Sequence, residues 1–183
     1  MNLELYFLRS SESKIVSDMI KYAYRLDETD KNVRDFPHLS IYDDFYGLSA
    51  KDLGIYAMAD KRVAGAVWCR KLAKERNLTA FVDENTPVLS MAVLPEFRNS
   101  GVASAMMTQF LQEAGASFES LSANVLADSR AIGFYEKFGF VKLENSDKKS
   151  LIDGADIFTM VKKLEFKEVA RPKDPYDATY WIE

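Results

Sequence analysis

The segment most suggestive of chemistry runs from Arg98 to Ala103, in the order Arg-Asn-Ser-Gly-Val-Ala. It lies between an apolar run at 88–94 and a segment with helical periodicity. The first amides of a helix have no partner within the helix, and the helix dipole adds partial positive charge, so a helix start can bind phosphate. Gly101 permits close approach of the main chain, and Arg98 adds a charge at the rim. Alone, so short a pattern is also typical of an ordinary turn that needs glycine.

Few other residues are suited to catalysis or metal binding. The single cysteine, Cys69, lies in an apolar segment, which predicts a buried thiol and excludes an intrachain disulfide. The single histidine, His38, could titrate near neutrality, although we expect a structural or exposed side chain rather than a base. No metal site is expected, because the chain has no cluster of histidine and cysteine.

The elements that must position these residues follow from hydrophobic periodicity. A first helix is expected after Ser10 or Ser11 as its N-cap, ending near Asp27. Three more helices are expected at 40–46, 101–117 and 129–138. Strands are expected at 3–9, 53–59, 63–72, 88–94, 121–126, 140–143 and 157–164, with a short apolar piece at 78–82.

The order of these elements predicts a mixed α/β domain. Strand 88–94, helix 101–117 and strand 121–126 form a βαβ unit, so these two strands should be parallel. The remaining strands favour an antiparallel arrangement. We therefore expect a mainly antiparallel sheet with one parallel pair and helices on both faces.

Length and composition fit one soluble globular domain, with 183 residues, 48% hydrophobic and 28% charged. The net charge of −4 disfavours nucleic acid as a partner, because phosphate backbones attract basic surfaces. No segment approaches the roughly 20 apolar residues of a membrane helix, and the N-terminus does not resemble a signal peptide. We expect a cytoplasmic protein with no membrane partner.

Two parts of the chain are expected, a catalytic domain at 1–164 and a C-terminal tail at 165–183. The aromatic residues Tyr176, Tyr180 and Trp181 argue against pure disorder of the tail. We expect it to pack on the same domain. Two alternatives are that the tail edges the cleft for an acceptor substrate or that it joins a homodimer.

Two segments carry a resemblance to a known family. Residues 88–111 (VLSMAVLPEFRNSGVASAMMTQFL) resemble the cofactor motif of the GCN5-related N-acetyltransferases (GNAT), a strand followed by Q/R-x-x-G-x-G/A at a helix start. Residues 128–140 (DSRAIGFYEKFGF) are similar to the family's second motif, N-x-x-A-x-x-x-Y-E-K-x-G-F, and the turn 82–87 resembles one branch of the family. Two motifs in the right order and spacing make a specific match.

The resemblance implies the GNAT fold and acetyl-coenzyme A as co-substrate. The two parallel strands would splay apart, often at a bulge in the first, and expose main-chain groups to the ligand. By this resemblance, main-chain groups of Met91, Ala92 and Val93 would face the pantetheine arm, and Arg98 would lie at the phosphate rim. The implied N–H donors to the pyrophosphate are those of Asn99, Ser100, Gly101, Val102, Ala103 and Ser104.

The resemblance also places Tyr135 near the coenzyme A sulfur as general acid. A phenol is protonated at neutral pH and can donate a proton to a leaving thiolate. Its alternative is a core tyrosine whose hydroxyl reaches water. Asp128 departs from the family's usual asparagine, and an ionised carboxylate accepts but does not donate hydrogen bonds. A cofactor contact and a helix N-cap are therefore both open for Asp128.

The general base has no strong candidate. Asp83 and Glu84 lie in the turn before strand 88–94, where a solvated turn is the alternative. Desolvation of the amine or a water chain could replace a base, and much of the rate could come from positioning. A strand amide such as that of Val93 could polarise the thioester carbonyl.

The segment between Asp27 and Asp52 combines acidic and aromatic side chains. In the family this region covers the acceptor pocket, where such side chains would suit a cationic amine. A solvated surface with aromatic anchors is the alternative. The residues concerned are Glu28, Asp30, Asp35, Asp43 and Asp44, with Phe36, Tyr42, Phe45 and Tyr46.

These observations together predict an acetyl-coenzyme A-dependent N-acetyltransferase that acts on an amine of a small molecule or peptide. The amine would attack the thioester directly, without an acetylated cysteine. The alternatives are a non-catalytic coenzyme A-binding sensor and an enzyme that uses a longer acyl-coenzyme A.

Overall fold

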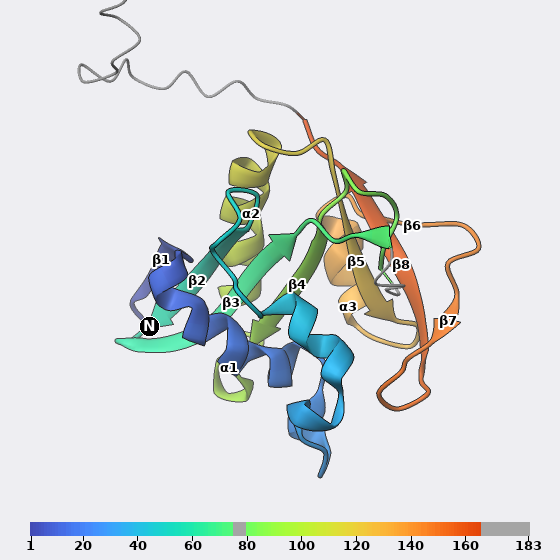
Figure 1. Cartoon of the computed structure of the whole chain (residues 1–183). Coiled ribbons are helices and arrows are strands. Elements are labelled where there is room, and N and C mark those ends of the chain that lie inside the picture. Colours follow the sequence, from blue (N-terminus) through green and yellow to red (C-terminus); the bar gives the residue numbers. More distant parts are fainter. Residues whose placement is uncertain (75–79, 166–183) are drawn as a thin grey trace, which may run out of the picture.

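The computed structural model describes residues 1–74 and 80–165, and within these residues eight strands form one mixed sheet (Figure 1). The strand order is β1-β2-β3-β4-β5-β8-β6, and β7 also pairs with β8. All pairs are antiparallel except β4 with β5, which confirms the predicted fold class. The bounds are β1 Leu3–Phe7, β2 Leu53–Ala59, β3 Arg62–Arg70, β4 Val88–Val93, β5 Ser120–Leu126, β6 Val141–Lys142, β7 Lys148–Lys149 and β8 Asp156–Lys163.

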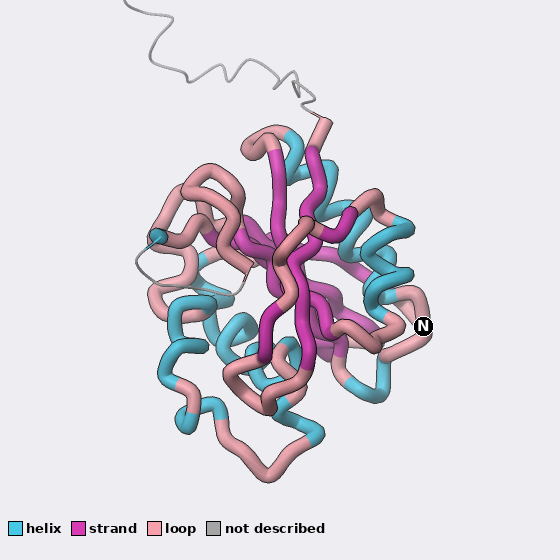
Figure 2. The backbone as a smooth tube through the Cα atoms, turned by 90° about the vertical axis from the view of Figure 1, so that its right-hand side faces the viewer, coloured by secondary structure: helices cyan, strands magenta, loops and turns pink. Residues whose placement is uncertain are grey.

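Helices cover both faces of the sheet (Figure 2). Helix α1, Ser13–Ala23, packs on β3 and β4, and the short 3-10 helices that follow it contribute to the same core. Helix α2, Val102–Gly115, packs on β2 and β3 from the opposite face, and α3, Ala131–Lys137, packs on β5. The 3-10 helices are η1 Ser10–Glu12, η2 Leu26–Glu28, η3 Val33–Asp35, η4 Pro37–Tyr42 and η6 Pro95–Phe97.

The central strands are buried on both faces because their alternate side chains enter two separate cores. In β3, Val67 and Cys69 face the core under α2, whereas Ala66 and Trp68 face the core under α1. The Trp68 indole N–H donates to the carbonyl of Tyr42 at 3.0 Å, so its one polar atom is satisfied. This two-sided burial explains why the strand segments have near-continuous apolar sequences.

Strands β4 and β5 separate almost as soon as they meet. Their only register pair is Val88 with Ser122, and the Ser122 amide donates to the carbonyl of Pro87 at 3.0 Å. The splay predicted from the family resemblance is therefore present. The expected bulge in the first strand is not, because β4 pairs with β3 in unbroken register from Val88 to Val93. The register shift lies instead between β2 and β3, at Ala57/Met58.

Several predicted boundaries were wrong on the α1 side of the sheet. Helix α1 ends at Ala23 rather than near Asp27, because Arg25 adopts a left-handed conformation (φ 58°) that breaks the helix. Ser10 and Ser11 lie inside η1 and do not cap α1. The helix predicted at 40–46 is the 3-10 helix η4 followed by turns.

Other predictions concern segments that the structure describes only in part. The apolar piece predicted at 78–82 lies partly outside the described residues, and residues 80–82 form no strand. The tail, apart from Glu165, also lies outside them. The two-residue strand β7 was not predicted. None of the described helices is long and apolar enough to cross a membrane.

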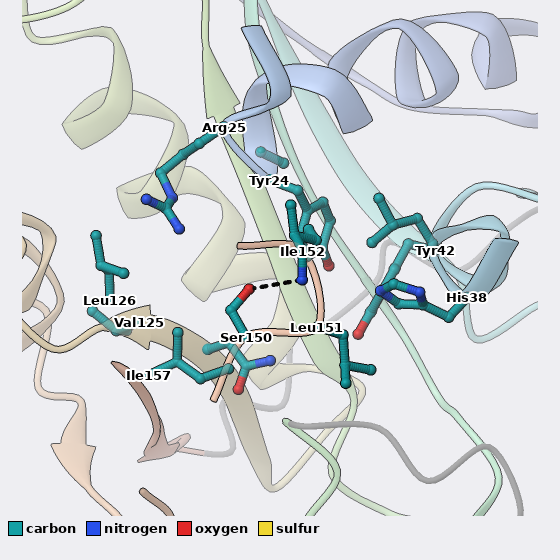
Figure 3. Close-up of a pocket in the computed structure, with 13 residues that line it drawn as sticks. Tyr24, Arg25, His38, Tyr42, Val125, Leu126, Ser150, Leu151, Ile152 and Ile157 are labelled. Carbon is teal, nitrogen blue, oxygen red and sulfur yellow. Dashed lines mark hydrogen bonds between the residues drawn. The ribbon is translucent and has the colours of Figure 1, made fainter. Parts of the chain in front are cut away.

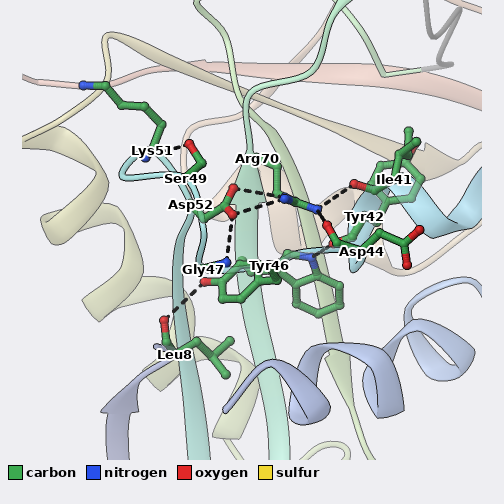
Figure 4. Close-up of polar contacts among 11 residues, drawn as sticks. Leu8, Ile41, Tyr42, Asp44, Tyr46, Gly47, Ser49, Lys51, Asp52 and Arg70 are labelled. Atoms are coloured by element: carbon green, nitrogen blue, oxygen red, sulfur yellow. Dashed lines mark hydrogen bonds and ion pairs between the residues drawn. The ribbon is translucent and has the colours of Figure 1, made fainter. Parts of the chain in front are cut away.

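A nearly buried ion pair fastens the segment after η4 to β3 (Figure 4). The Arg70 guanidinium donates to both carboxylate oxygens of Asp52, at 3.0 and 3.2 Å, and to the carbonyls of Ile41 and Asp44. Asp52 also accepts from the Gly47 amide at 2.9 Å. The side chains of Arg70 and Asp52 are 13% and 3% exposed, so water solvates neither charge well and each needs the other as its counter-ion.

Replacing Asp52 by alanine should lower the free energy of unfolding by about 3 kcal/mol, because the guanidinium would stay buried without its counter-ion. Urea denaturation of the purified protein measures this loss. Asp147→Ala, which breaks the exposed pair with Lys142, is the matched control and should cost less than about 1 kcal/mol. Equal losses for the two variants would contradict the anchoring role of Asp52.

Candidate active site

The loop from β4 to α2 presents main-chain amides that have no partner. No acceptor among the described residues takes a hydrogen bond from the amides of residues 99–104, and no side chain caps α2. Asn99 (φ 59°) and Gly101 (φ 89°) are both left-handed, a conformation that glycine adopts without strain and asparagine tolerates. Where left-handed residues stand among right-handed ones, successive N–H groups point toward a common concave site, which suits anions.

The space in front of this loop is free. A Cβ atom built on Gly101 would meet no atom within 4 Å, so the loop is not filled by the protein's own side chains. The Ser100 hydroxyl donates to the carbonyl of Phe97, which braces the loop from behind. Unpaired amides, the start of a fourteen-residue helix and free space together fit a phosphate group.

Arg98 braces the same loop rather than standing free at its rim. Its Nε donates to the carbonyl of Val93 at 3.1 Å, and its guanidinium pairs with Asp27 at 3.3 Å and Glu28 at 3.7 Å. The Asp27 side chain is 10% exposed, and its second oxygen is buried without a hydrogen-bond partner among the described residues. The predicted phosphate contact of Arg98 stays a prediction, and its charge is largely offset by these carboxylates.

The splay leaves main-chain groups of β4 facing the gap. The Pro87 carbonyl faces β5, because it accepts the hydrogen bond from Ser122. Successive residues of a strand direct their main-chain groups to opposite sides, so Met91 and Val93 face the β5 side as well. Ala92 faces β3 and is buried. Met91 and Val93 therefore direct their main-chain groups into the gap and Ala92 directs its own toward β3, and the predicted contacts of all three with pantetheine stay predictions.

Tyr135 lines a small cavity of about 50 Å³ where β4 and β5 part. Its ring packs on Phe134 and Phe140 with centroids 5.6 and 5.1 Å away, and burial raises the pKa of its phenol. The Tyr24 hydroxyl lies 3.1 Å from the Ser90 hydroxyl in the same wall. The described residues that line this cavity are Ala23, Tyr24, Val88, Leu89, Ser90, Met91, Asn124 and Tyr135.

A second cavity of about 130 Å³ adjoins the first (Figure 3). The two cavities share Ala23, Tyr24 and Asn124, so they lie next to each other around the end of α1. The walls of the larger cavity come from the end of α1, from η4, from β5 and from the β7–β8 connection. Its other lining residues are Arg25, His38, Leu39, Tyr42, Val125, Leu126, Ser150, Leu151, Ile152 and Ile157.

Three predicted candidates lie away from both cavities. Asp128 is exposed, and it is not the N-cap of α3, because that helix begins later and Ser129 accepts the hydrogen bond from the Ala131 amide. Asp83 accepts from the amides of the two residues at 85 and 86, as a turn residue does, and Glu84 is exposed beside it. Neither carboxylate lines a cavity, so the structure does not bring a general base from this turn to the site.

The single cysteine and the single histidine of the chain lie in different surroundings. Cys69 is fully buried within β3, and burial raises the pKa of its thiol, which confirms the predicted buried thiol. His38 lines the larger cavity, where partial burial lowers its pKa and favours the neutral imidazole. Among the described residues, no group of three or more potential ligands could hold a metal ion.

The acidic side chains of the segment 27–52 do not line either cavity. Asp27 and Glu28 pair with Arg98, Asp35 accepts from the Asn32 amide, and Asp52 pairs with Arg70. The aromatic residues of the segment have separate environments. Tyr42 lines the larger cavity, Tyr46 is a core residue that donates to the Leu8 carbonyl, and Phe45 is 77% exposed.

Sequence reasoning missed most of the cavity lining. Tyr24 and Arg25 stand at the end of α1, Ser90 and Asn124 alternate with core residues on β4 and β5, and the segment 150–152 lies beyond β7. The only local signal was a polar residue inside each of two apolar strands, Ser90 and Asn124. The rest became neighbours through long-range packing that no local pattern indicates.

The fold and this site define an acyltransferase architecture, in which a splayed parallel pair lies beside an anion-binding helix start. The model of the acetyltransferase (GNAT) domain matches residues 51–142, half of the chain. The chain therefore belongs to the GNAT family, is an acetyltransferase and has the N-acetyltransferase domain, for which acetyl-coenzyme A is the typical co-substrate. A comparison with curated protein sequences gives no match.

Many solved structures share the fold. A GNAT-family acetyltransferase from Streptococcus pneumoniae has a TM-score of 0.65 at 17% identity, over 89% of this chain and 99% of that one. The ribosomal-protein-S18-alanine N-acetyltransferase from Escherichia coli has a TM-score of 0.63 at 14% identity, over 93% and 99%. The protein yncA from Salmonella typhimurium, solved with its cofactor acetyl-coenzyme A, has a TM-score of 0.63 at 15% identity, over 93% and 97%.

Replacing Gly101 by glutamate should weaken the binding of coenzyme A about 100-fold or more, because the change adds a negative charge and a strained backbone at the open amides. Isothermal titration calorimetry with coenzyme A measures the loss. Gly154→Glu is the matched control, since Gly154 also has a positive φ (71°) and free space around it. Unchanged affinity of the Gly101 variant would contradict the phosphate site at 99–104.

Proposed function

We propose that the chain transfers the acetyl group of acetyl-coenzyme A to a primary amine of a small molecule or peptide. The observation that supports this best is the set of unpaired amides at 99–104 beside the gap between β4 and β5. A diphosphate held at these amides would leave the acyl end directed along the gap toward the cavity of Tyr135. Met91 and Val93 would offer strand-like hydrogen bonds to the amides of the pantetheine arm.

The reaction is a direct attack in a ternary complex. The amine nitrogen forms a bond to the thioester carbonyl carbon and the carbon–sulfur bond breaks. The sulfur takes the proton of the Tyr135 hydroxyl, while the proton lost by the amine passes to solvent, from which the phenolate is reprotonated. The products are an acetamide and free coenzyme A. Cys69 takes no part, because it is buried in the core under α2.

Three features of the site support these roles. The Tyr135 phenol is held by ring contacts at the meeting point of the cavity and the gap, so its position is fixed by packing. The main-chain N–H of Val93 faces the gap and is a candidate donor to the thioester carbonyl. No carboxylate of the described residues lines either cavity, so the amine would be deprotonated by solvent or through its own desolvation in the site.

Tyr135→Phe should lower kcat by about 100-fold or more, because the leaving sulfur would lose its proton donor while the ring packing is kept. Release of free thiol from acetyl-coenzyme A, measured with a panel of primary amines, gives kcat. The affinity for coenzyme A should stay within a factor of about two. Phe134→Tyr, a change on the adjacent ring, is the control for general disturbance of the cavity. Full activity of the Tyr135 variant would contradict its acid role.

The pH profile offers a separate test of Tyr135. A general acid acts in its protonated form, and burial raises the pKa of this phenol above the ordinary value of about 10. The acceptor acts as the free amine, which increases with pH. We therefore expect kcat/KM to rise with pH and then stay level, without a descending limb below about pH 10. A descending limb that begins near pH 8 and is absent from the residual activity of Tyr135→Phe would contradict this assignment.

A further inference from the structure

The larger cavity has the character of a binding site for an apolar molecule with one charged end. Its lining includes the apolar side chains of Leu39, Val125, Ile152 and Ile157 together with Tyr24 and Tyr42. The centroids of the two tyrosine rings lie 5.0 Å apart, so the rings are in contact. Among the described residues that line it there is no aspartate or glutamate, and the carboxylate of Asp153 lies outside the lining, paired with Arg25.

Among the described residues that line this cavity, Arg25 is the one whose side chain carries a full charge at neutral pH. Its side chain is directed over the cavity from the end of α1 (Figure 3). His38, the other titratable base of the lining, has its pKa lowered by burial and is mainly neutral. The charged group that the described lining presents to the cavity is therefore a guanidinium, which is paired with a carboxylate outside the lining.

Arg25 is held in place but keeps free donors. One nitrogen pairs with the Asp153 carboxylate at 3.0 Å, and no other acceptor among the described residues takes a hydrogen bond from its remaining N–H groups. Arginine has five such donors in a planar fork, which suits a second carboxylate as well. Lys31 adds a further positive charge at the rim, where its ammonium donates to the carbonyl of Ile152 at 2.7 Å.

We infer that the acceptor is a primary amine that carries a carboxylate on an apolar skeleton, as an apolar amino acid does. This inference rests on the proposed function and gives its substrate class. The carboxylate pairs with the Arg25 guanidinium, the skeleton contacts Leu39, Tyr42 and Ile152, and the amine faces the Tyr24 side, where the two cavities adjoin. The acid-rich segment 27–52, which by composition alone suits a cationic acceptor, has its carboxylates outside the cavity.

The test compares amino acids with their own amides. The purified full chain is assayed for thiol release from acetyl-coenzyme A with leucine, methionine and phenylalanine, with the three corresponding amides, and with spermidine. The amide has the more readily deprotonated amine, so simple reactivity favours it over the acid. We expect kcat/KM at least about 10-fold higher for an amino acid than for its amide, because one charged hydrogen-bonded pair is worth that factor or more.

Arg25→Gln should remove this preference. It should lower kcat/KM for the amino acid about 10-fold or more, mainly through KM, and lower kcat/KM for the amide much less, so that the ratio of the two falls toward one. Arg34→Gln is the matched control. Arg34 lies in η3, not far along the chain from Arg25, and its side chain is exposed and lines neither cavity. Retained turnover of the amide shows that the Arg25 variant is folded.

Two results would overturn the inference. One is a kcat/KM for the amides or spermidine that equals or exceeds that for the amino acids. The other is an equal loss for acid and amide in Arg25→Gln. Both leave the transferase itself intact. By contrast, absence of thiol release with every amine, in a protein that binds acetyl-coenzyme A, would contradict the proposed function and the inference with it.

Discussion

The gap between β4 and β5 is the constraint on which the rest of the site depends. Strand β4 follows β3 through six register pairs and β5 follows β8 through seven, so each strand takes its direction from its antiparallel neighbour. Only Val88 and Ser122 join the two. Main-chain groups on the facing edge of β4 are thereby left without strand partners in the middle of a sheet, where unpaired groups are costly once water is excluded. A ligand that pairs like a strand satisfies them.

The chain at the end of α1 connects the amide loop with the two cavities beside this gap. Arg98 joins the amide loop to Asp27 and Glu28, a few residues beyond α1, and also holds the Val93 carbonyl at the end of β4. Tyr24, at the same helix end, lines both cavities. The left-handed conformation of Arg25 ends the helix there and turns the chain along the larger cavity. The chain around one helix terminus therefore contacts the amide loop, through Asp27 and Glu28, and also lines the two cavities, through Tyr24.

The sequence predicted the parts of the molecule whose determinants are local. The buried strand at 88–94, the glycine at a left-handed position and the helix after it are contiguous, so periodicity and one motif were sufficient. The direction of Ala92 could not be predicted, because it depends on which neighbour pairs with which edge of β4. The larger cavity is assembled from four separate segments of the chain. The composition of 27–52 suited recognition of a cationic amine by acidic side chains, but the carboxylates of Asp27 and Asp52 pair with Arg98 and Arg70 instead.

Burial accounts for both the acid and the missing base of the proposed reaction. The Tyr135 phenol is removed from solvent, and this burial disfavours its charged form and so keeps the phenol protonated. The same surroundings disfavour an ammonium ion, so an amine that enters is driven toward its neutral, nucleophilic form without a neighbouring carboxylate. In an α-amino acid the carboxylate and the amine are bonded to the same carbon, so a pair with Arg25 would lie beside the reacting nitrogen. Arg25 follows Tyr24 directly in the chain, and both line the larger cavity. The guanidinium would thus balance the carboxylate charge close to the place where burial makes the amine neutral.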